Sequence, residues 1–114
     1  NTLTSDRAMF DFMRRQLAAH PELALGGPSL GWLHDALRET RNLVLSPAPA
    51  VPCMTWLGSA EEIVDTPAIR RRIATWPGAR LIPVPGGRHE VLMETPAIRQ
   101  TVFDGIAAFF ATYG

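Results

Sequence analysis

Three kinds of side chain in this sequence could together catalyse acyl transfer. Ser29 lies in the pentapeptide GPSLG, which fits the pattern G-x-S-x-G found around nucleophilic serines. Glu61 and Asp65 follow it along the chain, and His89 comes after them. A histidine oriented by a carboxylate can take a proton from a serine hydroxyl and pass it to a leaving group. The order serine, acid, histidine therefore raises the hypothesis of a hydrolytic triad.

The acids and the histidine each follow a predicted strand. Residues 51–58 form a continuous apolar run that ends in glycine, which is typical of a strand buried on both faces. Residues 79–87, ARLIPVPGG, indicate a second short strand, whose prolines favour an edge position or an early end. Reactive groups in α/β sheets gather at the carboxyl ends of parallel strands, so these two loops should meet. The alternative is a surface histidine beside ordinary loop acids.

Helices must pack around these strands. Helix spacing and capping residues predict helices over 5–19, 29–40, 66–76 and 94–114, with a stiff proline connector over 46–52. Thr66 is the predicted N-cap of the third helix, followed by Pro67. The last helix has a predicted inward stripe made of Ile98, Val102, Ile106, Phe109 and Tyr113.

The second half of the chain alternates strand, helix, strand, helix, which indicates a parallel α/β sheet. Two strands do not make a stable sheet alone. We therefore expect an incomplete sheet that belongs to a larger fold, either because a partner segment supplies strands or because the chain is the C-terminal part of a larger hydrolase. The second expectation is favoured, and a first residue of Asn1 agrees with it.

Composition limits the function classes. The 114 residues are 46% hydrophobic and 19% charged, with a formal net charge of zero, which is typical of a soluble globular chain. The zero balance argues against nucleic acid or an anionic membrane as the main partner. The single cysteine, Cys53, cannot form an internal disulfide and is predicted to be a buried thiol. The sequence has neither a signal peptide nor an 18-residue apolar span, and we expect a cytoplasmic protein.

The sequence resembles a known family over residues 51–114. The segment PCMTWLGSAEEIVD, a helix, WPGARLIPVPGGRHEVLMETPAIR and a helix ending in AAFFATYG are similar to the C-terminal part of the lysophospholipase and monoacylglycerol lipase group of α/β-hydrolases. Residues 1–45 resemble the end of that group's cap and the approach to the next core strand. The resemblance implies an α/β fold with two parts, 1–45 from the cap and 46–114 as the C-terminal βαβα part of the core.

The resemblance also implies roles for individual residues. His89 matches the family's catalytic histidine. Glu61, three residues after the strand-ending Gly58, matches the acid position, where many relatives carry Asp. Asp65 is the second candidate for the acid, and its other role would be to cap the next helix.

The substrates that the resemblance implies are lysophospholipids or monoacylglycerols, with no metal and no cofactor. Trp32 and Leu33, with Phe10 and Met13, could line an acyl pocket, or they could equally be core residues. The partner implied is the N-terminal part of the hydrolase. Exposed strand edges and apolar faces would also favour a homodimer.

The surroundings of Ser29 differ from those of a nucleophilic serine, although the pentapeptide matches. Pro28 precedes it, although the nucleophile turn is strained and a rigid residue without an N–H is atypical there. Only 28 residues precede Ser29, and most of them read as one helix rather than a core strand. We therefore expect Ser29 to cap a helix.

Three hypotheses remain for the whole chain. In the first, the chain is a fragment of a serine ester hydrolase that carries the acid and the histidine but lacks the nucleophile, and so is inactive alone. In the second, it is a small self-contained hydrolase that uses Ser29. In the third, it is a non-enzymatic α/β interaction module.

Overall fold

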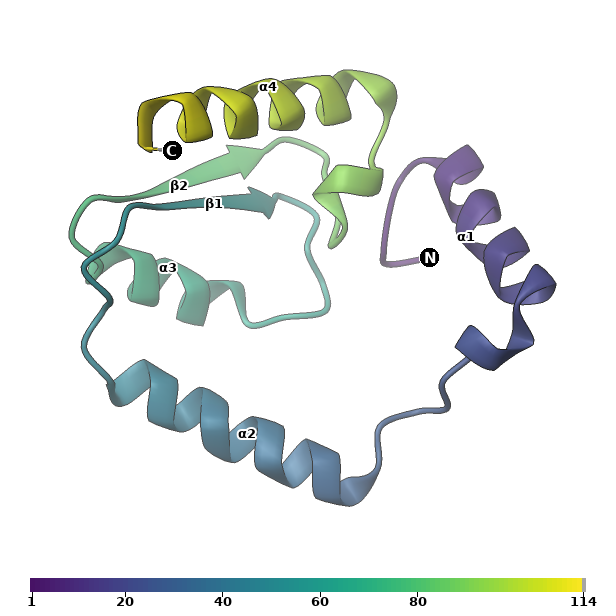
Figure 1. Ribbon diagram of the computed structural model, residues 1–114, viewed down its shortest axis with the longest axis horizontal. Helices are drawn as coiled ribbons and strands as arrows, with labels where there is room; N and C mark the ends of the chain where they lie inside the picture. The colour runs from purple at the N-terminus through teal and green to yellow at the C-terminus, as the bar shows by residue number, and fades with distance from the viewer. Residues whose placement is uncertain (114) are drawn as a thin grey trace.

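A computed structural model describes residues 1–113 of the chain (Figure 1). Its helices and strands alternate in the order predicted for the second half of the chain, with two helices before them. The elements are α1 (Arg7–Ala19), the 3-10 helix η1 (Pro21–Leu23), α2 (Leu30–Leu45), β1 (Cys53–Gly58), α3 (Thr66–Ala74), β2 (Ala79–Val84), the 3-10 helix η2 (Val91–Met93) and α4 (Pro96–Tyr113).

The two strands form a parallel sheet, as predicted. The register pairs Cys53 with Ala79 at one end and Gly58 with Val84 at the other. Figure 1 shows α3 and α4 on opposite faces of this sheet. A parallel pair needs a crossover connection, and α3 supplies it. Both strands therefore end at the same edge, from which the two loops with acids and histidine leave.

The core lies where the strands end against α4. Leu57, Val84 and Val102 are the buried apolar side chains among residues 1–113. Of β1 only its last two residues are buried and the others are half-buried, so the prediction of a strand buried on both faces is wrong for most of its length. The sheet has just two strands in the described chain, so each strand keeps an open edge.

Helix α4 packs on the sheet through its predicted stripe, except at its end. Val102 is buried, whereas Tyr113 is 53% exposed, contrary to prediction. An 18-residue helix is about 27 Å long, and a six-residue strand is about 20 Å long. The last turn of α4 therefore has no strand to cover it, and the Tyr113 ring packs on Phe109 instead, with ring centroids 4.9 Å apart.

The helix boundaries follow capping chemistry, with two differences from prediction. Helix α2 starts after Ser29 as expected but continues to Leu45, because the residues beyond position 40 are compatible with a helix until Pro47 approaches. The N-cap of α3 is Asp65, not Thr66. The Asp65 carboxylate accepts from Ala68 N at 3.1 Å, which leaves Thr66 as the first helical residue.

The proline connector is fastened to α3. Arg72 Nη1 donates to Ser46 O at 2.8 Å, and the Trp76 indole N–H donates to Val51 O at 3.0 Å. The Arg72 guanidinium lies 5.6 Å from the centre of the Trp76 ring, at cation–π distance. These contacts hold the two ends of the connector against α3 and against Trp76, two residues after α3.

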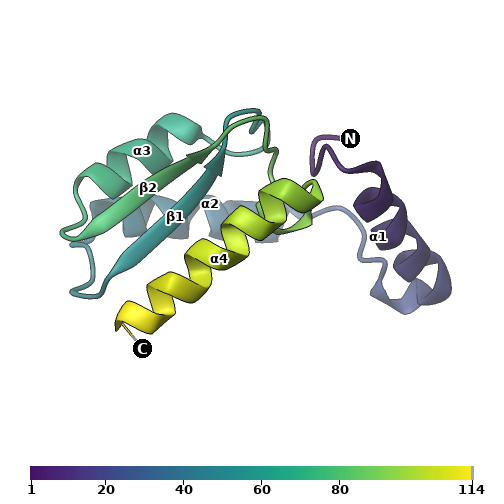
Figure 2. The ribbon, with the colours of Figure 1, turned by 90° about the horizontal axis from the view of Figure 1, so that it is seen from above.

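Helices α1 and α2 lie outside the sheet layers (Figures 1 and 2). Neither contains a buried residue. The described chain exposes 8,176 Å², whereas a compact monomer of this mass exposes about 6,200 Å². Its radius of gyration is 16.3 Å, against about 13 Å for a compact domain of this length. No helix within residues 1–113 is long and apolar enough to cross a membrane.

Candidate active site

Backbone hydrogen bonds join the two loops at the carboxyl edge of the sheet. Ser59 N donates to Val84 O, and Ala60 N donates to Gly87 O, both at 2.9 Å. The first residues after β1 are therefore held against the first residues after β2. The side chains that follow, Glu61 and His89, start from backbone whose relative position is fixed.

Gly58 allows this close approach. A Cβ atom at this position would lie 2.3 Å from Gly87 O and 2.4 Å from Arg88 O, distances that real side chains do not adopt. The second loop thus crosses directly over the end of β1. The glycine that ends the predicted strand is a requirement for bringing the histidine loop to the acid loop.

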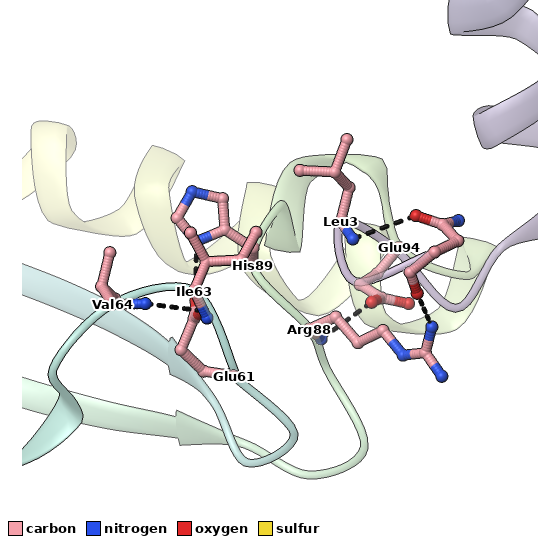
Figure 3. A network of polar contacts seen from close by, with 8 residues as sticks. Leu3, Glu61, Ile63, Val64, Arg88, His89 and Glu94 are labelled. Carbon is pink, nitrogen blue, oxygen red and sulfur yellow. Dashed lines mark hydrogen bonds and ion pairs between the residues drawn. The ribbon is translucent and has the colours of Figure 1, made fainter. Parts of the chain in front are cut away.

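His89 and Glu61 form the centre of the site (Figure 3). His89 Nδ1 lies 2.8 Å from Glu61 Oε2. The Glu61 side chain is 4% exposed, and the His89 side chain is 29% exposed. The other carboxylate oxygen, Oε1, accepts from Ile63 N at 2.5 Å and from Val64 N at 3.3 Å. Glu61 is therefore held by its own loop while it holds the imidazole ring.

These contacts keep the Glu61 carboxylate ionised. Burial by itself raises the pKa of Glu61, but hydrogen bonds from Ile63 N, His89 and Val64 N, together with the charge of His89, outweigh burial. The net result is a pKa below the ordinary value of the group. An ionised carboxylate on Nδ1 fixes the tautomer that places the Nδ1 proton toward Glu61 and leaves Nε2 as a proton acceptor.

The Nε2 atom of His89 has no hydrogen-bond partner within residues 1–113. The ring is partly exposed, so a group from another segment can reach this atom. The pair has the geometry of an imidazole ring oriented by a carboxylate, with its second ring nitrogen open to another group. No three His, Cys, Asp or Glu side chains in the described chain gather closely enough to hold a metal ion.

Asp65 lies apart from the histidine contact. Its Oδ1 accepts from Ala68 N as the cap of α3, and its Oδ2 is 3.9 Å from Arg71 Nη2. Its side chain is 64% exposed. Of the two candidate acids, the structure brings Glu61 to His89 and places Asp65 at a helix start.

Ser29 serves as the cap of α2. Its Oγ accepts from Trp32 N at 3.1 Å. In the described chain it makes no hydrogen bond with His89, whose ring contacts Glu61. The two candidate acyl-pocket residues lie on α2 and are exposed, Trp32 by 62% and Leu33 by 42%. Exposed side chains do not form an acyl pocket by themselves.

Sequence reasoning missed Glu94. This residue is fully buried, and its carboxylate contacts the N-terminal segment and the histidine loop. A signal was present, since the pentapeptide TPAIR occurs at 66–70 and 95–99, each time after an acidic residue. The first acid, Asp65, caps its helix on the surface. The second acid is turned inward, which the shared local pattern did not indicate.

Comparisons with known proteins place hydrolases among the proteins similar to this chain. No family model matches the chain. It is 29% identical over 110 residues to the probable lysophospholipase L2 of Haemophilus influenzae, covering 96% of this chain and 35% of that protein. It is 27% identical over 119 residues to lysophospholipase L2 of Escherichia coli K12, with the same coverage. The chain thus spans about a third of the length of these relatives.

A solved structure has the same fold. It is a soluble variant of monoglyceride lipase from Saccharomyces cerevisiae in complex with a substrate analog, with a TM-score of 0.76 and 23% identity. The match covers 99% of this chain and 41% of the lipase. The expected α/β fold, a partial α/β-hydrolase with an incomplete sheet, is confirmed. So is the resemblance to the C-terminal part of such a hydrolase.

Proposed function

We propose that this chain, a C-terminal part of an α/β-hydrolase, supplies the acid and the histidine of a serine ester hydrolase. The observation that carries the proposal is the 2.8 Å contact between His89 Nδ1 and Glu61 Oε2 at the carboxyl edge of two parallel strands. The nucleophilic serine belongs to a segment outside these 114 residues. We assign Ser29 the role of a helix cap instead, a role that its bond from Trp32 N supports.

In the proposed reaction His89 acts twice. Its Nε2 takes the proton of the serine hydroxyl while the serine oxygen bonds to the ester carbonyl carbon. The same proton then passes to the alkoxide that leaves, and an acyl-enzyme remains. Water attacks the acyl group with His89 again as base, and the proton returns to the serine oxygen. Glu61 stays ionised throughout and stabilises the imidazolium.

The proposed substrates are lysophospholipids or monoacylglycerols. This class is supported by the names of the relatives, lysophospholipase and monoglyceride lipase. Residues 1–45 would be the end of the cap, and Trp32 and Leu33 would line the acyl chain once the rest of the hydrolase covers α2. Their exposure in the described chain leaves them free for that contact.

Fluorophosphonate labelling tests the location of the nucleophile. The probe is applied to the full-length protein that contains these residues, and the labelled peptide is mapped by mass spectrometry. We expect a label on a serine outside residues 1–114 and loss of that label in His89→Ala. A label on Ser29 would replace this proposal with a self-contained hydrolase. Absence of any label, together with absence of esterase activity, would favour a non-enzymatic interaction module.

A further inference from the structure

We infer that Glu94 is a positioning residue that holds the histidine loop in place and ties it to the N-terminal segment, residues 1–5. The inference rests on the proposed role of His89 and adds a residue to it. Glu94 does not touch His89. It acts through the backbone of Arg88, directly before the histidine, and through Ser5 of the N-terminal segment.

The Glu94 carboxylate receives hydrogen bonds from two parts of the chain. Its Oε1 accepts from Arg88 N at 2.8 Å and from Ser5 N at 3.0 Å. Its Oε2 accepts from the Ser5 hydroxyl. Arg88 directly precedes His89, so the Glu94 carboxylate fixes the backbone before the histidine. The same carboxylate binds Ser5, which lies 89 positions away in the sequence. We call Ser5, Arg88 and Glu94 the Glu94 clamp (Figure 3 shows Arg88 and Glu94).

The residue after the histidine is held by the same N-terminal segment. Glu90 N donates to Leu3 O at 2.8 Å. Next to it, the Thr4 hydroxyl donates to Met93 O at 2.7 Å, and Thr4 is 2% exposed. Both neighbours of His89 are therefore anchored, one through the Glu94 clamp and one through Leu3. The loop has little freedom to turn the imidazole away from Glu61.

The charge of Glu94 strengthens the clamp. A buried carboxylate is costly unless hydrogen bonds compensate for its lost hydration. Here burial raises the pKa of Glu94, but hydrogen bonds from Ser5, Arg88 N and Thr95 N outweigh it and hold the pKa below the ordinary value. The carboxylate is thus ionised at neutral pH, and hydrogen bonds to an ionised acceptor are stronger than neutral ones.

The clamp also connects the site to α1. Thr4 Oγ1 accepts from Asp6 N at 3.0 Å, and Asp6 is the N-cap of α1. The direction in which α1 leaves the core is therefore set within two residues of the clamp. If residues 1–45 belong to the cap, as proposed above, one buried carboxylate fixes both the cap entry and the histidine loop.

The test compares four variants of the full-length protein, Glu94→Ala, Glu94→Gln, Ser5→Ala and the matched control Glu90→Ala. The control removes an acid that is adjacent to His89 and whose side chain makes no hydrogen bond in the described chain. One readout is steady-state hydrolysis of a monoacylglycerol. The other is the nitrogen NMR signal of the His89 ring, which reports its tautomer and its contact with Glu61 without requiring activity.

Glu94→Ala should lower kcat by about 10- to 100-fold with little change in KM, because a displaced base costs rate more than binding. The His89 signal should lose the signature of an Nδ1 proton held by a carboxylate. Glu94→Gln should restore most of both, since its amide oxygen can accept the two N–H groups that Oε1 accepts. Ser5→Ala should move both readouts in the same direction by a smaller amount, and it serves as the test if Glu94→Ala does not fold.

An unchanged His89 signal in Glu94→Ala, or in Ser5→Ala if the former is unfolded, would overturn the inference. An equal effect of Glu90→Ala would overturn it too, because any change in the loop would then suffice. If His89→Ala leaves hydrolysis intact, the proposed function fails. The NMR comparison still decides separately whether Glu94 positions the ring.

Discussion

Two carboxylates four positions apart in one loop have different surroundings. Glu61 is 4% exposed and holds His89, while Asp65 is 64% exposed and caps α3. The loop turns between them because the Glu61 carboxylate accepts the backbone N–H groups of Ile63 and Val64. A carboxylate thus orients the histidine at position 61 and caps a helix at position 65.

Glu61→Gln tests whether ester hydrolysis requires the carboxylate of Glu61. The amide removes the negative charge that stabilises the imidazolium and disturbs the tautomer, so we expect ester hydrolysis by the full-length protein to fall by about 10³- to 10⁴-fold. Asp65→Asn is the matched comparison. Asn caps helices about as well as Asp, so α3 and activity should be preserved. Steady-state kinetics with a short-chain ester would measure both.

Glu62→Gln is the second control, because Glu62 is exposed and neighbours Glu61 in the chain. It should leave the rate unchanged. A large loss of activity in Asp65→Asn with normal activity in Glu61→Gln would identify Asp65 as the acid and contradict our assignment.

The free energy of unfolding should decrease as the pH is lowered, because the carboxylates of Glu61 and Glu94 become protonated. The pKa values of Glu61 and Glu94 lie below the ordinary 4.5 in the folded chain. Between the folded pKa values and 4.5, the unfolded chain binds more protons than the folded chain. The two carboxylates therefore stabilise the folded chain fully above about pH 4.5, and this stabilisation is lost as the pH falls through the folded pKa values. Urea unfolding of the 114-residue chain at pH 7, 5, 4 and 3 would measure the slope.

Glu94→Gln should show a flatter pH dependence than the wild-type chain, because one of the two groups no longer titrates. Glu62→Gln should follow the wild type. Parallel curves for Glu94→Gln and the wild type would show that Glu94 does not contribute to acid sensitivity.

The local sequence predicted Glu61 and His89, which follow strands, but it did not predict the role of Glu94, which follows no strand directly. Glu61 and His89 come shortly after apolar runs that end in glycine, so parallel topology alone brings their loops together. Glu94 contacts Ser5 across 89 positions. Nothing near Glu94 in the sequence indicates that partner, because the contact depends on where the whole N-terminal segment folds.

At the scale of elements, small residues decide how closely helices approach. Gly105 of α4 faces Trp56 of β1, and a Cβ atom there would lie 2.3 Å from Cζ2 of the indole. Helix α4 can therefore lie flat on the sheet only with glycine at this point. The end of α2 was harder to predict, because the residues after position 40 contain no helix-breaking residue before Pro47.

Gly105→Ala should destabilise the chain although alanine favours helices. Overpacking costs about 1–3 kcal/mol in free energy of unfolding, against a helix-propensity gain of at most about 1 kcal/mol. Gly31→Ala in α2 is the matched control, because the nearest atom to its Cβ would be Ser29 Oγ at 4.0 Å. Gly31→Ala should be neutral or stabilising.

Denaturant unfolding of both variants would measure the difference. Equal stability changes in Gly105→Ala and Gly31→Ala would mean that Trp56 moves aside without cost, and that the close approach of α4 is not a constraint.

At the scale of the molecule, the chain exposes apolar surface that a compact domain would cover. The large apolar side chains of α2 are 42–87% exposed. They are Leu30, Trp32, Leu33, Leu37, Leu43, Val44 and Leu45. The relatives are about three times longer than this chain. In the longer hydrolase proposed above, the remaining residues would cover these side chains.

The 114-residue chain alone should therefore self-associate. Light scattering with increasing concentration should show dimers or larger species, and a dye that binds apolar surface should fluoresce with it. Replacing Leu33 and Leu37 by Glu should reduce both signals, while replacing the exposed Arg38 and Arg41 by Glu should not. A clean monomer at all concentrations would contradict this expectation.

The span of the Glu94 clamp has a consequence for the order of folding. Strand pairing closes loops of 26 residues, from Cys53 to Ala79, whereas the clamp closes one of 89 residues. The longer closure costs about 1 kcal/mol more in chain entropy. The βαβ unit should thus form early, and the clamp late. The histidine loop would acquire its final geometry only after residues 1–5 have docked, which makes the contact between His89 and Glu61 a late product of folding.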